Sequence, residues 1–180
     1  MLNNIIIIKI IEYIGDNPKR NELHLTPIRV VKSMKEIYCG YKLNLTDMEK
    51  SFDYNNSNTD LIYIKNVFFG SNCEHHMLPF FGQANFVYCP SKKIIGLSKF
   101  INILNFYSAR LQTQERLARQ VVNYIKNILR PRAIILKLSC KHICMLMRNV
   151  KSICSTSGTV INEGLSTISP TLMLKMLFII

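Results

Sequence analysis

The sequence predicts one α+β domain, in which a four-stranded antiparallel sheet carries two helices on one face and is preceded by N-terminal helices. The chain has 180 residues, of which 48% are hydrophobic and 19% charged, so it can bury one ordinary core. β-Branched and aromatic runs occur in two pairs, separated by two segments of helical periodicity. The order strand, strand, helix, helix, strand, strand is typical of a sheet whose helices share one face.

Residues 1–44 are expected to form a helical segment. The apolar run 2–14 predicts a short first helix. A second helix is better marked, with Thr26 as N-cap, Pro27 at the first helical position and Gly40 at the end. Its apolar stripe, which we expect to pack against other elements, consists of Val30, Met34, Ile37 and Tyr38.

Residues 45–59 are rich in Asn, Ser, Asp and Thr, lack apolar periodicity and are expected to form a surface loop. They separate the helical segment from the core, residues 60–164. The first two strands of the core are expected at 61–69 and 83–88. The stretch 78–82, which contains Pro and Gly, is interpreted as part of the connection between these strands.

Two helices and two further strands complete the core. Ser98 is expected to cap a helix that reaches about residue 109, and a second helix follows over about 113–129. The buried stripe of the second helix consists of Leu117, Val121, Ile125 and Ile128. The chain returns to strand over 134–147, and a weaker final strand covers about 156–162.

The apolar end, residues 165–180, does not follow the pattern of the core. Three interpretations stay open for it: a helix, an aberrant terminus or an aggregation-prone segment. Its most apolar part, Leu172–Ile180, contains Lys175 and is too short to cross a membrane.

The edge strands of the predicted sheet indicate an oligomer. In a monomer these apolar edges would be exposed, and an exposed edge strand tends to pair with another chain. Joining the sheets of several subunits into a barrel removes those edges, so we expect an oligomer.

Charge and cysteine content narrow the functional class. A net charge of +12 favours an anionic partner, but no run of five or more basic residues occurs. We therefore expect a phosphorylated small molecule as the partner, and neither nucleic acid nor a membrane.

The six cysteines are expected to be reduced thiols, because a chain with an ordinary apolar fraction does not need disulfides. This indicates a cytoplasmic location.

Three of the four histidines lie in two short motifs, Cys73-Glu74-His75-His76 and His142-Ile143-Cys144. Two thiols and one imidazole provide three ligands for Zn²⁺, one fewer than a closed structural site needs, which leaves one position for water. The alternation of a strand would point His142 and Cys144 the same way. Remaining imidazoles near the ion can transfer protons. A closed zinc knot with a fourth ligand, or a set of unligated core residues, stays open as the alternative.

Five stretches of the sequence match a known family in order: Thr26-Pro27-Ile28-Arg29-Val30, Ser71-Asn72-Cys73-Glu74-His75-His76-Met77-Leu78-Pro79-Phe80, Gly96-Leu97-Ser98-Lys99, Arg110-Leu111-Gln112-Thr113-Gln114-Glu115-Arg116-Leu117 and His142-Ile143-Cys144-Met145-Leu146-Met147-Arg148. Through them the sequence resembles the GTP cyclohydrolase I family over about residues 15–164. The resemblance implies the tunnelling fold for the core and a homodecamer with active sites between subunits. It also implies a set of metal ligands, Cys73, His76 and Cys144, and a pair of acid–base residues, His75 and His142.

The resemblance further implies GTP as substrate. Glu115 can accept hydrogen bonds from both N1–H and the exocyclic amino group of guanine, which adenine does not offer. The alternative is an exposed glutamate that the helix dipole favours in the first turn. The other residues implied for nucleotide binding are Lys99 and Arg148 for the triphosphate, Ser98 and Gln114 lining the pocket, and Arg29 and Lys32 from a neighbouring subunit. For Arg29 and Lys32 a solvated helix face is the alternative.

The implied reaction converts GTP into formate and 7,8-dihydroneopterin triphosphate, the first step of pterin synthesis for folate or tetrahydrobiopterin. Three positions depart from the family pattern: Asn102 and Phe68 replace a basic and an acidic residue, and Asn149 replaces a glycine. Asn102 and the divergent C-terminal segment leave an alternative open: a catalytically idle member of the same fold that binds GTP or a partner protein. A further hypothesis, a zinc-stabilised nucleic-acid binder, is supported only by the net positive charge of the chain. A deazaguanine nitrile reductase of the same fold is disfavoured by the intact ligand trio.

Overall fold

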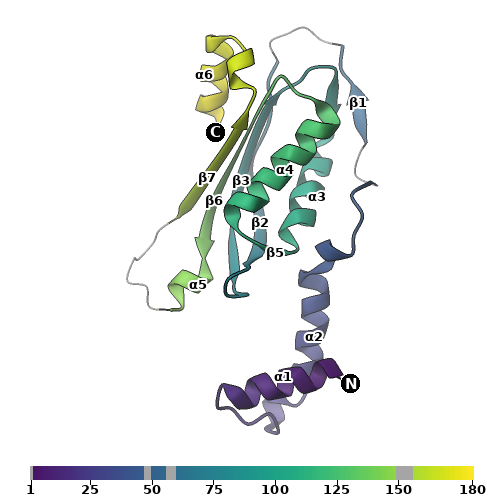
Figure 1. Ribbon diagram of the computed structural model, residues 1–180, viewed down its shortest axis with the longest axis vertical. Coiled ribbons are helices and arrows are strands. Elements are labelled where there is room, and N and C mark those ends of the chain that lie inside the picture. The colour runs from purple at the N-terminus through teal and green to yellow at the C-terminus, as the bar shows by residue number, and fades with distance from the viewer. Residues whose placement is uncertain (1, 47–49, 56–59, 149–155) are drawn as a thin grey trace.

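The computed structural model describes residues 2–46, 50–55, 60–148 and 156–180, and side chains from residue 4 onward. It confirms a mixed α+β fold (Figure 1). A long sheet carries helices α3 and α4 on one face, and helix α6 lies beside the opposite end of the sheet from α5. Helices α1 and α2 extend away from the sheet, at the end where β5 and α5 lie. This end therefore gathers segments from remote parts of the sequence.

Four long strands form the body of the sheet and pair antiparallel: β2 (Ile62–Cys73), β3 (Pro79–Cys89), β6 (Ala133–His142) and β7 (Ser157–Glu163). The expectation of four strands is nevertheless wrong, because the two-residue strand β5 (Leu111–Gln112) joins the outer edge of β2 in parallel. The sheet order is β5-β2-β3-β6-β7. A two-residue strand is too short to leave an alternating pattern in the sequence.

The strand boundaries also differ from those expected. The stretch 79–82 belongs to β3 rather than to the connection, since a proline is tolerated as the first residue of a strand. Strand β6 ends at His142, and the next residues form the helical turn α5 (Ile143–Leu146). The presumed loop 45–59 contains the short strand β1 (Ser51–Asp53), which pairs with β4 (Lys93–Ile95) in a separate small sheet.

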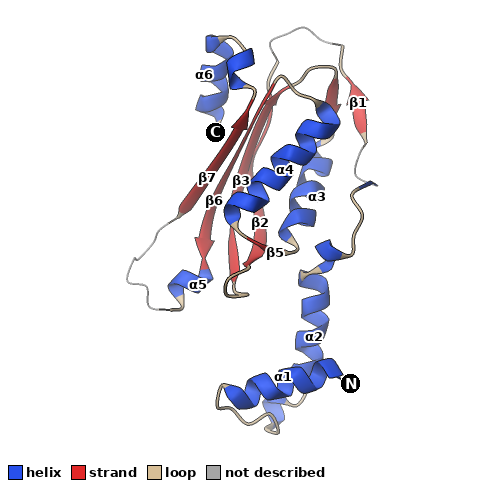
Figure 2. Ribbon diagram, viewed as in Figure 1, coloured by secondary structure: helices blue, strands red, loops and turns tan. Residues whose placement is uncertain are grey.

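Two helices cover one face of the sheet, α3 (Leu97–Ser108) and α4 (Gln114–Leu129) (Figure 2). The expected stripe of α4 is confirmed, because Leu117, Val121 and Ile125 are fully buried. Thr113 caps α4, and its hydroxyl oxygen accepts a hydrogen bond from the Arg116 N–H at 3.2 Å. The cap expected for α3 is wrong: Gly96 occupies that position, and its successor Leu97 already begins the helix.

The opposite face of the sheet is partly covered by α6 (Pro170–Ile179), so the helix interpretation of the C-terminal segment is confirmed. Ser169 caps this helix through a 3.3 Å bond from the Leu172 N–H. A second apolar cluster forms between α6 and the sheet from Val87, Cys89, Ala133, Ile135, Leu172 and Met176. Alternate residues of β6 therefore serve two cores, one under α4 and one under α6.

The N-terminal segment consists of α1 (Leu2–Tyr13), α2 (Thr26–Ile37) and two short 3-10 helices, Asn21–Leu23 and Cys39–Tyr41. Leu25, not Thr26, occupies the N-cap of α2. The expected packing of the α2 stripe is met only in part within this chain: Val30 and Tyr38 are half-buried, whereas Met34 and Ile37 remain 39% and 45% exposed. Among the helices of the described residues, none combines the length and apolar character that a membrane crossing requires.

Gly82 and Gly70 provide a matched test of the sheet register. A Cβ at Gly82 would overlap the carbonyl oxygen of Ser139 and lie 2.8 Å from the Cα of Cys140, whereas one at Gly70 meets nothing within 4 Å. Gly82→Ala should lower the free energy of unfolding by roughly 2 kcal/mol through overpacking. Gly70→Ala should change it by less than about 0.5 kcal/mol. Urea unfolding at equal chain concentration measures both, and equal midpoints would contradict this register.

Candidate active site

Three potential metal ligands converge at the end of the sheet near β5 and α5. Cys73 is the last residue of β2, His76 lies in the following turn, and Cys144 lies in α5. Their ligand atoms all lie within 4.8 Å of one another, so these residues could hold a metal ion. The expected convergence is confirmed, although Cys144 reaches the cluster from a helical turn rather than from a strand.

Backbone hydrogen bonds shape the turn that carries two of these ligands. The N–H of Cys73 donates to the carbonyl of Leu78 at 2.8 Å, and the N–H of Met77 donates to the carbonyl of Cys73 at 2.8 Å. Met77 adopts a positive φ of 53°, which closes the turn. The N–H of Glu74 donates to the carbonyl of Gln112 in β5 at 3.0 Å. The neighbouring strand therefore fixes the turn from outside.

The donor set has the chemistry of a transition-metal site. Burial raises the pKa of the Cys144 thiol, and the adjacent Cys73 raises it further. Two neighbouring thiols oppose joint deprotonation, and a divalent cation would remove that opposition. Both cysteines are buried, while His76 is exposed. Two thiolates and an imidazole suit Zn²⁺ with one open position.

His142 lies beside this cluster in a defined orientation. Its ring stacks on Phe80 at a centroid distance of 4.9 Å and an interplanar angle of 13°. Burial lowers the pKa of His142, and the negative charge of Glu115 partly opposes that shift. The imidazole is therefore biased toward its neutral form, as a general base requires.

Gln114 fixes the tautomer of His142. The Gln114 amide group donates to the carbonyls of Leu138 and Ser157 at 3.1 and 3.2 Å. Its side-chain oxygen therefore lies 3.0 Å from His142 Nε2 and also accepts from the Ser157 hydroxyl at 2.6 Å. Because a carboxamide oxygen only accepts, Nε2 carries the hydrogen and Nδ1 is left as the basic nitrogen. Gln114 is 2% exposed, so its side chain supports His142 rather than lining an open pocket.

Three other expected residues lie around the cluster. His75 Nδ1 is 3.7 Å from Cys73 Sγ, and the ring is exposed. Arg148 donates from Nη1 to His76 Nε2 at 2.6 Å. Glu115 is exposed in the first turn of α4, where it accepts a long 3.4 Å bond from the Thr159 hydroxyl.

The remaining expected residues are not brought to the cluster within one chain. The hydroxyl of Ser71 donates to the carbonyl of Ser108 at 2.7 Å, so the metal end of β2 lies against the C-terminal end of α3. Ser98 and Lys99 lie at the other end of this helix, and the helix between Ser98 and Ser108 rises about 15 Å. The phosphate-binding candidates are thus separated from the metal ligands.

Arg29 and Lys32 lie on α2, outside the sheet. Arg29 lines a cleft of about 900 Å³ that α2 forms with α3 and the ends of β2 and β3. Asn102, one of the positions that depart from the family pattern, lines the same cleft. Phe68 is exposed on β2, and Asn149 lies outside the described residues.

Sequence reasoning missed the stacking of Phe80 on His142 and the support that Gln114 gives. The strand register pairs Phe80 directly with His142. A correct boundary for β3 would have revealed the first contact, because directly opposed residues on neighbouring strands are close. No local pattern reveals the second contact, since it joins α4 to the end of β6.

Comparison with known proteins agrees with this geometry. The family model described as GTP cyclohydrolase I matches residues 4–177. The chain belongs to the GTP cyclohydrolase I family. The match includes most of the C-terminal segment that sequence reasoning had set apart from the family.

Relatives named GTP cyclohydrolase 1 support the same assignment. One from Chlorobium chlorochromatii is 37% identical over 160 residues, which cover 89% of this chain and 72% of the relative. One from Brucella anthropi is 38% identical and covers 83% and 71%, and one from Gloeobacter violaceus is 36% identical and covers 86% and 74%. The chain is therefore an enzyme of this family, whose substrate is GTP.

A solved structure also shares the fold. The crystal structure of the archaeosine synthase QueF-Like in the apo form has a TM-score of 0.50 and 16% sequence identity. It covers 61% of this chain and 97% of that chain. At this identity the likeness concerns the arrangement of the sheet and helices alone.

Metal binding should require Cys73 and Cys144, which converge with His76, and should not require a cysteine outside the cluster. Wild-type protein should hold about one equivalent of divalent metal per chain, and Cys144→Ala or Cys73→Ala should lose it. Cys39→Ala is the matched control, because Cys39 lies in the 3-10 helix after α2 and outside the cluster. Elemental analysis and the thiolate charge-transfer band of Co²⁺-substituted protein measure the result. Metal retained by Cys144→Ala would contradict the site.

Proposed function

We propose that the chain is a zinc-dependent GTP cyclohydrolase I that converts GTP into formate and 7,8-dihydroneopterin triphosphate. The convergence of Cys73, His76 and Cys144 beside an oriented His142 carries the proposal. Bound zinc would supply Lewis-acid activation of water for attack at C8 of the purine. The product would enter folate or tetrahydrobiopterin synthesis. Metal binding needs free thiols, which favours a reducing compartment such as the cytoplasm.

The two histidines that are not metal ligands would move protons. Opening of the imidazole ring and release of C8 as formate require proton transfer at N7, N9 and the formyl group. His142 would accept or return a proton at Nδ1, because Gln114 occupies Nε2. His75 lies on the exposed side of Cys73 and would serve as the second acid–base group.

Glu115 would select guanine. Its carboxylate makes one long hydrogen bond to Thr159 among the described residues, so acceptor capacity remains for a ligand. Guanine presents N1–H and an amino group side by side, and a carboxylate accepts both with charge-assisted strength. Adenine lacks the N1–H, so it would leave the carboxylate incompletely paired at a cost in binding energy.

A second copy of the chain would complete the site, in a homodecamer. Arg148 approaches from the metal side, but Ser98, Lys99, Arg29 and Lys32 lie elsewhere in the same chain. The cluster therefore lacks most of its expected phosphate ligands unless a neighbour supplies them. The exposed apolar face of α2 is consistent with subunit contact.

One alternative is retained. Asn102 replaces a basic residue and lines the cleft beside Arg29, so triphosphate binding could be too weak for turnover. In that case the protein would bind GTP or a partner without releasing formate. Formate release over many turnovers by zinc-loaded protein excludes this alternative, and zinc retention with no formate or pterin fluorescence defeats the enzymatic proposal.

His142→Ala and His75→Ala should each lower formate release by about 10² to 10⁴-fold, while zinc content stays at the wild-type level. Neither side chain is needed as a metal ligand, so formate release should fall while zinc content does not. His24→Ala is the matched control, because His24 is exposed and remote from the cluster. Formate and pterin fluorescence are measured with zinc content on the same samples. Full activity of His142→Ala would refute its assigned role.

Mixed oligomers test whether two chains share a site. Cys144→Ala lacks the metal and Lys99→Met lacks a phosphate ligand, so each variant alone should be inactive. Subunits mixed in equal amounts and reassembled at random should recover about a quarter of wild-type activity, because some sites combine an intact residue from each chain. If one chain supplied both residues to a site, mixing would restore nothing.

A further inference from the structure

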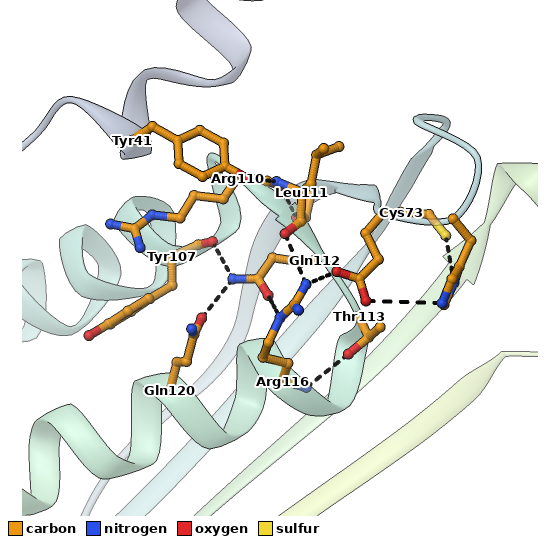
Figure 3. A network of polar contacts seen from close by, with 12 residues as sticks. Tyr41, Cys73, Tyr107, Arg110, Leu111, Gln112, Thr113, Arg116 and Gln120 are labelled. Atoms are coloured by element: carbon orange, nitrogen blue, oxygen red, sulfur yellow. Dashed lines mark hydrogen bonds and ion pairs between the residues drawn. The ribbon is translucent and has the colours of Figure 1, made fainter.

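Glu74 lies between Cys73 and His75 in the metal-binding turn, and its Oε1 is 4.0 Å from His75 Nε2. Its carboxylate forms an ion pair with Nη2 of Arg116, in the first turn of α4 (Figure 3). Arg116 directly follows Glu115. The ion pair therefore links the metal-binding turn to the segment that carries the proposed reader of the base.

The guanidinium of Arg116 is held in place by further bonds. Nη2 also donates to the carbonyl of Leu111 at 3.2 Å, and Nε donates to the side-chain oxygen of Gln112 at 3.1 Å. Gln112 is 1% exposed, and its amide nitrogen donates to Tyr107 O at 2.9 Å and to Gln120 Oε1 at 2.7 Å (Figure 3). A buried, fully bonded amide thus orients the guanidinium toward Glu74.

The backbone reinforces the same connection. Gln112 is paired with Cys73 between β5 and β2, and its carbonyl accepts the N–H of Glu74 at 3.0 Å. The two residues at the start of the turn are thereby tied to β5 through the main chain, and Glu74 is tied to α4 through its side chain. The turn also contains the positive φ of Met77, a conformation that surrounding bonds must maintain.

We propose that Glu74 and Arg116 are positioning residues that clamp the metal-binding turn against the start of α4. The clamp keeps Cys73 and His76 at a fixed distance from Glu115. A purine bound by Glu115 is thereby held in a fixed position relative to the metal. The inference rests on the proposed function, and it assigns to this ion pair a role in the geometry of the site. Without Arg116 the carboxylate of Glu74 would keep, among the described residues, its 4.0 Å contact with His75 Nε2 as its one ionic partner.

An ordinary exposed ion pair would not have this effect, and the chain provides one for comparison. Lys126 and Glu163 form a 2.9 Å pair farther along α4, with side chains 52% and 35% exposed. The Arg116 and Glu74 side chains are similarly exposed, at 44% and 31%. Such pairs contribute little to stability in general. The two pairs have similar exposure but differ in location and in the further bonds that hold Arg116.

A double-mutant cycle tests the clamp. Glu74→Gln, Arg116→Met and the double variant are compared with wild type for zinc release to a chromogenic chelator and for kcat and KM. Each single variant should release zinc about tenfold faster, as for other residues that support metal ligands. The effect on turnover should fall on kcat more than on KM. The double variant should match the single variants, because both remove one interaction.

Three further variants sharpen the test. Arg116→Lys keeps the charge but loses the Nε bond to Gln112, so its zinc release should lie between wild type and Arg116→Met. The control variants Lys126→Met and Glu163→Gln should leave zinc release and turnover unchanged. The d–d absorption of Co²⁺-substituted protein should change only in the clamp variants, because it reports ligand geometry.

Additive effects, unchanged zinc release, or equal changes in the control variants would overturn the clamp. Glu74→Gln preserves side-chain size, so it decides the outcome if Arg116→Met does not fold. Zinc release and cobalt spectra do not require GTP turnover. A wild-type protein that retains zinc but releases no formate would therefore refute the proposed function and leave the clamp to be judged on metal release.

Discussion

The register between β3 and β6 is the constraint on which the site depends. It pairs Phe80 with His142 and thereby brings the end of β6, and α5 after it, to the turn that follows β2. A shift of one residue would point His142 to the opposite face of the sheet. The close approach of Gly82 to Ser139 excludes larger side chains and helps to fix this register. The candidate metal ligands, which come from distant segments, converge because of this pairing.

A single chain offers only part of a nucleotide site. The metal cluster, His142 and Glu115 lie at one end of the sheet, while Lys99 lies at the far end of α3. The net charge of +12 is consistent with a polyanionic substrate, but the cations implied for phosphate are distributed over remote surfaces. Association of copies would bring the two kinds of surface together, and it would also cover the apolar face of α2.

The fold alone does not determine the chemistry. An archaeosine synthase shares the arrangement of sheet and helices at 16% identity, whereas the relatives at about 37% identity are named GTP cyclohydrolase 1. On this scaffold the chain carries a local feature that could hold a metal ion: two thiols and an imidazole at the end of β2 and in α5. The ion pair of Glu74 with Arg116 connects that local feature to the adjacent helix.

The sequence by itself determined the α+β class, the boundaries and buried stripe of α4, and which two cysteines and one histidine would converge. These features depend on periodicity, capping and residue chemistry, which act over a few neighbouring positions. Only the tertiary structure decided that β5 joins the sheet, that Met34 and Ile37 of the α2 stripe stay exposed, and that Gln114 supports His142. These features depend on hydrogen bonds and packing between segments far apart in the chain, which no local pattern encodes.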